Sequence, residues 1–161
     1  MGRRGRILIG MAAGALWSVG VVIGSSYGPQ PFLPLNIALI YAFLPAGLFL
    51  MLLVGRLAQR RFFDDAIIDG QLYVPGSGAE IDQRVLTNTV EQCVLALLLW
   101  PFVASWLGGV TVVVIGVAFG VARLAFWIGY HLSPPLRAFG FAASFYPTVL
   151  ATIWTLWRLL T

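Results

Sequence analysis

The sequence has few charged residues, and those it has are unevenly placed. Only 10% of its 161 residues are charged, whereas a soluble domain carries about 25%. No lysine is present, since all ten basic residues are arginine, and all six acidic residues fall between Asp64 and Glu91. Hydrophobic residues make up 60% of the chain, and its mean hydropathy is +0.90. This composition excludes an ordinary soluble domain and indicates an integral membrane protein. The net charge of +4 is typical of membrane topology and predicts no nucleic-acid partner.

Cysteine and histidine are each present only once. Cys93 has no partner for an intrachain disulfide, and we expect it to be a small packing residue. His131 has no set of further ligands nearby in the sequence, so we expect no metal site. The acidic residues Asp64, Asp65 and Asp69 are interpreted as part of a solvated loop.

Long apolar runs dominate the rest of the chain. They do not alternate with polar residues, which favours helices over strands, and a helical span needs about 20 residues. The sequence therefore predicts an all-α membrane bundle of five spans, at roughly 7–23, 33–57, 84–105, a fourth that follows Gly108-Gly109 and ends near Tyr130, and 136–160.

The first apolar run has two interpretations. Its Arg3-Arg4-Arg6 start and apolar core are also typical of an export signal, but no clear Ala-x-Ala cleavage site follows. We favour an uncleaved helix. Arginine placement then puts the N-terminus in the cytoplasm, together with the loop from Arg56 to Gln83. Five spans place the C-terminus on the other side.

Four polar residues lie where a membrane helix should be apolar. Arg84, Asn88 and Glu91 follow one another at i, i+4 and i+7, so they share one helix face. Arg123 stands alone in another apolar run. Charged groups at such depth are costly and mark candidate functional sites. One carboxylate, one amide and two guanidinium groups would suit a zwitterionic, amide-rich ligand better than a lipid tail.

This pattern resembles the MAPEG family, the membrane-associated proteins in eicosanoid and glutathione metabolism. The Arg84-x3-Asn88-x2-Glu91 motif opens a helix as in the family, Arg123 matches the family's arginine near the cytoplasmic end of the next helix, and 135–141 resembles the start of the last one. The resemblance covers roughly residues 33–160 and is to a bacterial-type member. It divides the chain into an additional N-terminal transmembrane helix, residues 1–28, and a MAPEG-like transmembrane domain, residues 29–161.

The resemblance implies a homotrimer of four-helix bundles in a bacterial inner membrane, with glutathione bound between subunits. By position, Arg84, Asn88 and Glu91 would hold glutathione, and Arg123 would stabilise its thiolate for attack on a lipophilic small molecule or a peroxide. A thiol has a pKa of about 8.5. A guanidinium about 4 Å away contributes up to about 4 kcal/mol at an effective dielectric constant of about 20, which is equivalent to a pKa decrease of up to about three units.

Three positions depart from the family pattern. Where members that bind glutathione well carry tyrosines, this sequence has Gln92, Val112 and Gly116. Two further function classes therefore remain open. One is a non-catalytic trimer that binds lipid or stabilises membrane partners, and the other is a small proton-coupled exporter that titrates Glu91.

Overall fold

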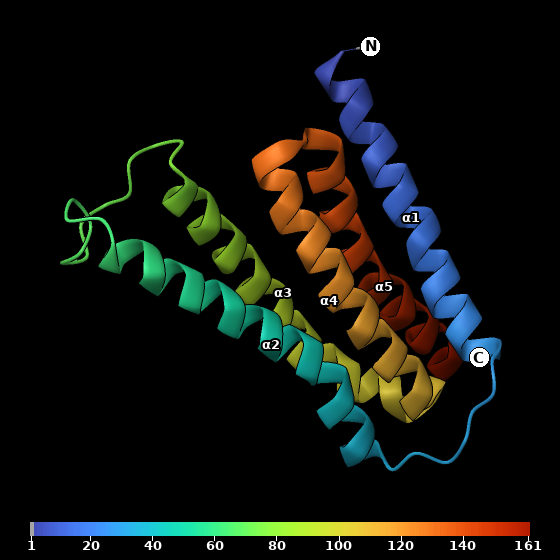
Figure 1. Ribbon diagram of the computed structural model, residues 1–161. Coiled ribbons are helices and arrows are strands. Elements are labelled where there is room, and N and C mark those ends of the chain that lie inside the picture. The colour runs from blue at the N-terminus through green and yellow to red at the C-terminus, as the bar shows by residue number, and fades with distance from the viewer. Residues whose placement is uncertain (1) are drawn as a thin grey trace.

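The computed structural model describes residues 2–161, without the side chain of Arg3, and this part of the chain is all-helical (Figure 1). All five helices are long and apolar enough to cross a membrane, as the sequence predicts. They are α1 (Arg3–Tyr27), α2 (Leu35–Phe62), α3 (Gly78–Leu107), α4 (Gly109–Leu132) and α5 (Pro134–Leu160).

The third helix begins six residues before the predicted Arg84, because local hydrogen bonds fix an earlier start. The Ser77 hydroxyl accepts a hydrogen bond from the backbone N–H of Glu80 at 3.2 Å. The Glu80 carboxylate in turn accepts one from the Gly76 N–H at 2.6 Å. This reciprocal pattern satisfies N–H groups that a helix start leaves free. The extension brings Glu80 and Asp82 into the same helix as the polar trio.

Short connections between the last three helices make them antiparallel neighbours. Gly108 alone separates α3 from α4, and its φ of +97° is a conformation that favours glycine. Ser133 alone separates α4 from α5, and Pro134 occupies the first turn of α5, where its missing N–H costs nothing.

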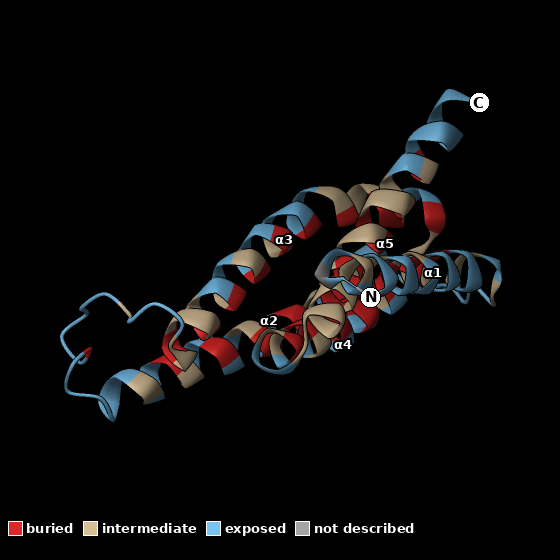
Figure 2. Cartoon of the chain, turned by 90° about the horizontal axis from the view of Figure 1, so that it is seen from above, coloured by how far each residue is buried: buried red, intermediate tan, exposed pale blue. Residues whose placement is uncertain are grey.

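The helices form two groups that meet at α4. In the first group, α1 packs along α5 and α5 packs along α4. In the second group, α2 packs on α4 and on α3 (Figures 1 and 2). The α2–α3 end projects away from α1, and the N- and C-termini lie at opposite ends of the bundle. Figure 2 shows α1 on the outside, with much of its surface exposed.

Two glycines of α4 allow α2 to approach closely. A Cβ atom at Gly116 would lie 2.1 Å from the carbonyl oxygen of Ala42, and one at Gly120 would lie 2.8 Å from the Cβ of Pro45. The Gly116-x3-Gly120 pair therefore lets α2 and α4 pack closely.

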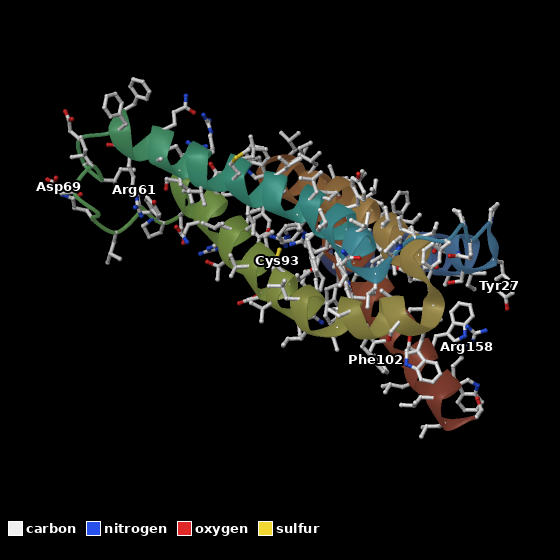
Figure 3. All side chains as sticks on the ribbon, turned by 90° about the horizontal axis from the view of Figure 1, so that it is seen from below. Tyr27, Arg61, Asp69, Cys93, Phe102 and Arg158 are labelled. Carbon is white, nitrogen blue, oxygen red and sulfur yellow. The ribbon has the colours of Figure 1, made fainter. Side chains whose placement is uncertain are left out.

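The aromatic core of the bundle and its α2–α3 loop end differ in chemistry. Trp100 is fully buried, stacks on Phe43 with 5.3 Å between ring centroids, and donates a 3.0 Å hydrogen bond to Thr148. The α2–α3 loop end carries charged side chains such as Arg61 and Asp69, and Phe102 and Arg158 lie toward the opposite end (Figure 3). The polar candidates of the sequence lie between the aromatic core and this loop.

Candidate functional site

Arg123 is fully buried, although it carries a guanidinium group. It lies near the middle of α4, nine residues before the helix ends at Leu132. The guanidinium carbon lies 4.2 Å from the ring centroid of Phe126 and 5.6 Å from that of Phe119. Such cation–π contacts stabilise a desolvated guanidinium.

Hydrogen bonds join Arg123 to two other helices. Its Nη1 donates to Oδ1 of Asn88 on α3 at 2.9 Å, and its Nη2 donates to the hydroxyl of Ser144 on α5. The third donor, Nε, has no partner among the described residues. A buried donor without a partner is costly, and this one leaves the guanidinium with an unused hydrogen-bonding position.

Asn88 connects the buried cation to the exposed carboxylate of Glu91. Its Nδ2 donates to Oε2 of Glu91 at 3.2 Å, while its Oδ1 accepts from Arg123. The Arg123–Asn88–Glu91 network thus places an amide between opposite charges. It runs from the protein interior to the surface of α3, because Glu91 is exposed.

Arg84 does not join this network. Its Nη2 lies 2.6 Å from Oε1 of Glu80, one turn earlier on the same helix, and its side chain is 61% exposed. The longer start of α3 explains this arrangement, because it supplies Glu80 at the i−4 position. The structure therefore brings Asn88, Glu91 and Arg123 together and leaves Arg84 on the surface nearby.

The three positions where the family pattern carries tyrosines are buried in this chain. Val112 is fully buried in the core, and Gly116 lies against the Ala42 backbone. Gln92 is 5% exposed, and neither polar atom of its side chain has a partner among the described residues. No hydroxyl group reaches the network from these positions.

A second polar cluster was not predicted from the sequence. Asp82 on α3 is fully buried and accepts hydrogen bonds from Arg60 of α2 at 2.6 Å and from Trp127 of α4 at 2.7 Å. His131, also on α4, lies 2.9 Å from the same carboxylate. The i, i+4 spacing of Trp127 and His131 was the available signal.

The described part of the chain contains no group of three or more histidine, cysteine, aspartate or glutamate residues arranged to hold a metal ion. Asp64, Asp65 and Asp69 lie in or beside the α2–α3 loop and are exposed. Cys93 is partly buried beside the aromatic core of the bundle.

Comparison with known proteins identifies the family. The model of the MAPEG family matches residues 35–157, which span α2, α3, α4 and most of α5 and include all four candidate residues. No curated protein and no solved structure matches the chain. The match leaves α1 outside the family region. Because the matched region covers most of the chain and all five helices are able to span a membrane, this integral membrane protein belongs to the MAPEG family.

Proposed function

We propose that the protein binds glutathione and activates its thiol for attack on a lipophilic electrophile or a peroxide. The observation that carries the proposal is the buried Arg123, hydrogen-bonded through Asn88 to Glu91, with its guanidinium Nε left without a partner among the described residues. A desolvated cation with a free donor is the environment that stabilises a thiolate.

Each of the four residues has a different role toward glutathione, which follows from its position. Arg123 stabilises the thiolate, since its guanidinium is the buried cation of the site. Asn88 presents an amide between cation and carboxylate, and Glu91 accepts from the ligand ammonium group. Arg84 binds a ligand carboxylate when its exposed guanidinium exchanges Glu80 for the ligand.

The chemistry then needs little else from the protein. With a carbon electrophile, the sulfur lone pair forms the new bond to carbon, and the electrons of the bond that breaks remain on the leaving group. With a peroxide, the sulfur bonds to one oxygen as the O–O bond breaks, so the sulfur is oxidised to a sulfenic acid and the peroxide is reduced to an alcohol. The thiol proton is released to water when glutathione ionises. Burial of Arg123 strengthens its attraction for the anion, because the effective dielectric constant is lower inside the bundle.

Glutathione titration by calorimetry tests the proposal on the detergent-purified full chain. We expect saturable binding at up to millimolar ligand, and loss of this binding in an Asn88→Leu variant that folds normally. Absence of heat in the parent protein at millimolar glutathione would refute the proposal.

A second candidate function is a non-catalytic trimer that binds lipid or stabilises membrane partners. It is favoured by the absence of tyrosine hydroxyls at Gln92, Val112 and Gly116, and at Gly116 the α2 backbone leaves no room for a side chain. Under this alternative Arg123, Asn88 and Glu91 are an internal network that joins helices. The same titration separates the two functions.

The proposal includes assembly and placement. We expect a homotrimer with ligand between subunits, in a bacterial inner membrane, with the N-terminus in the cytoplasm. The arginine bias of the N-terminus and of the α2–α3 end supports this orientation. Mass spectrometry from detergent should detect three chains, and reporter fusions at Ser77 and Thr161 should lie on opposite sides. A monomer that retains glutathione binding would refute the assembly.

A further inference from the structure

A hollow of about 470 Å³ lies beside the Arg123–Asn88–Glu91 network, within one chain. Four helices line it. The lining residues that matter here are Ile7 and Met11 of α1, Asn88 of α3, Phe126 and Tyr130 of α4, and Arg137 of α5. Its volume is in the range of about 300–1,000 Å³ that is typical of small-molecule sites.

Two walls of this hollow touch the guanidinium of Arg123 directly. Asn88 accepts its hydrogen bond at 2.9 Å, and the Phe126 ring lies 4.2 Å from its central carbon. A molecule in the hollow is therefore separated from Arg123 by only one side chain. The hollow therefore adjoins the network at Asn88 and Phe126.

The charged group in the hollow is a cation without a carboxylate partner. The guanidinium carbon of Arg137 lies 4.9 Å from the Tyr130 ring centroid, and Arg137 forms no ion pair with a described acidic side chain. Glu91 does not line the hollow. The lining thus combines one positive charge and polar atoms of Tyr130 and Asn88 with an apolar surface of Ile7, Met11 and Phe126.

The α1 wall is held by close packing against α5. A Cβ atom at Gly10 would lie 2.2 Å from the carbonyl oxygen of Pro135, and one at Gly14 would lie 2.5 Å from the Cβ of Ala142. Gly10 stands between Ile7 and Met11 in the sequence, so this contact holds the α1 backbone that carries both residues close to the start of α5. The α1 helix lies outside the family match, which covers residues 35–157.

We propose that α1 completes a binding site for a single-chain amphiphile with one anionic group. The carboxylate pairs with Arg137, and the apolar chain lies against Ile7 and Met11. The volume suits one chain and not a whole two-chain phospholipid. The interpretation of this amphiphile as the electrophile that glutathione attacks rests on the proposed function. Binding of the amphiphile itself does not depend on it.

Photo-cross-linking tests this proposal on the full chain in phosphatidylcholine nanodiscs. The probe is a diazirine derivative of oleate, and unlabelled oleate and oleyl alcohol are the competitors. We expect labelled peptides from α1 and the start of α5, and stronger competition by oleate than by the uncharged alcohol. Labelling confined to other helices, or equal competition by the alcohol, would overturn the proposal.

Matched variants assign the two ends of the ligand. Arg137→Gln should weaken oleate binding about tenfold, because a hydrogen bond to a charged group is lost, whereas Arg158→Gln at the far end of α5 should not. Met11→Trp should fill the hollow and weaken binding roughly tenfold. Leu8→Trp is its control, because Leu8 is 63% exposed. Equal losses in Met11→Trp and Leu8→Trp would contradict the proposed wall.

Two further measurements distinguish a single-chain ligand from phospholipid headgroups, and the proposed hollow from the proposed glutathione site. Nanodiscs that contain phosphatidylglycerol should leave oleate labelling unchanged; displacement by this lipid would assign the hollow to headgroups and overturn the single-chain ligand. Met11→Trp should retain glutathione binding by calorimetry. Oleate binding without glutathione binding would refute the proposed function and leave the hollow standing, and the reverse result would refute the hollow alone.

Discussion

The Asp82 cluster and the Arg123 network both join α3 to α4, yet they differ in how completely their charges are satisfied. Asp82 receives three side-chain partners, with Arg60, Trp127 and His131 all within 2.9 Å of its oxygens. Arg123 retains an Nε without a partner, and its network ends at the exposed Glu91. A cluster whose polar groups all have partners is suited to joining helices, and we call it closed. A network with a donor that has no partner can form a hydrogen bond to a ligand, and we call it open. The comparison predicts that changes at Asp82 act on stability and that changes at Arg123 act on chemistry.

The largest expected effect is on stability, from Asp82→Ala. This change leaves Arg60, Trp127 and His131 without their common acceptor at the α2–α3–α4 junction. Removal of one partner of a buried ion pair typically costs about 3–5 kcal/mol, and we expect a value near the lower limit, since Arg60 is partly exposed. Thermal unfolding in detergent measures the loss, with Asp69→Ala as the exposed control. Equal stability of the two variants would contradict a structural role for the cluster.

The next effect is on catalysis, from Arg123→Met. The replacement is apolar and of similar length, so the buried site loses its cation while the packing against Phe119 and Phe126 is largely kept. Loss of one preorganised donor to a developing anion typically lowers kcat by about 10²–10³-fold. Glutathione conjugation to a lipophilic electrophile measures this loss, and Arg158→Met is the control. A kcat of Arg123→Met within twofold of the parent value would contradict a catalytic role of Arg123.

These two predictions show how far the sequence alone could lead. It predicted five helical spans and the shared face of Asn88 and Glu91, because apolar runs and helix spacing are local patterns, whereas the role of Arg123 beside them came from the family resemblance. It did not predict the Asp82 cluster, since the carboxylate lies before the expected helix start and its partners come from two other helices. The Glu80–Arg84 pair was missed for the same reason: the capping bonds at Ser77 extend α3 toward the loop.

A smaller effect is expected from Glu91→Gln. The carboxamide keeps the hydrogen bond with Asn88 and removes the charge that pairs with the ligand ammonium group. We expect glutathione affinity to fall about tenfold, which is about 1.4 kcal/mol, while the unfolding temperature stays unchanged because Glu91 is exposed. Calorimetry measures the affinity, with Asp65→Asn as the control. Unchanged affinity would place the ligand elsewhere.

The smallest effect on glutathione affinity is expected from Arg84→Gln. This variant breaks the exposed pair with Glu80, and exposed pairs contribute at most about 1 kcal/mol. Unfolding should therefore remain within about 1 kcal/mol of the parent, while glutathione affinity decreases severalfold through loss of the ligand carboxylate contact. A stability loss as large as that of Asp82→Ala would show that the two α3 ion pairs do not differ as proposed.

The central claim is that the open network stabilises a thiolate, and ultraviolet absorbance of the bound ligand tests it most directly. Glutathione added to the purified protein at neutral pH should produce thiolate absorbance in the parent. Arg123→Met should abolish this absorbance at saturating ligand, and Glu91→Gln should restore the parent value once more ligand is added. Thiolate absorbance of equal size in Arg123→Met and the parent, at equal occupancy, would contradict the account.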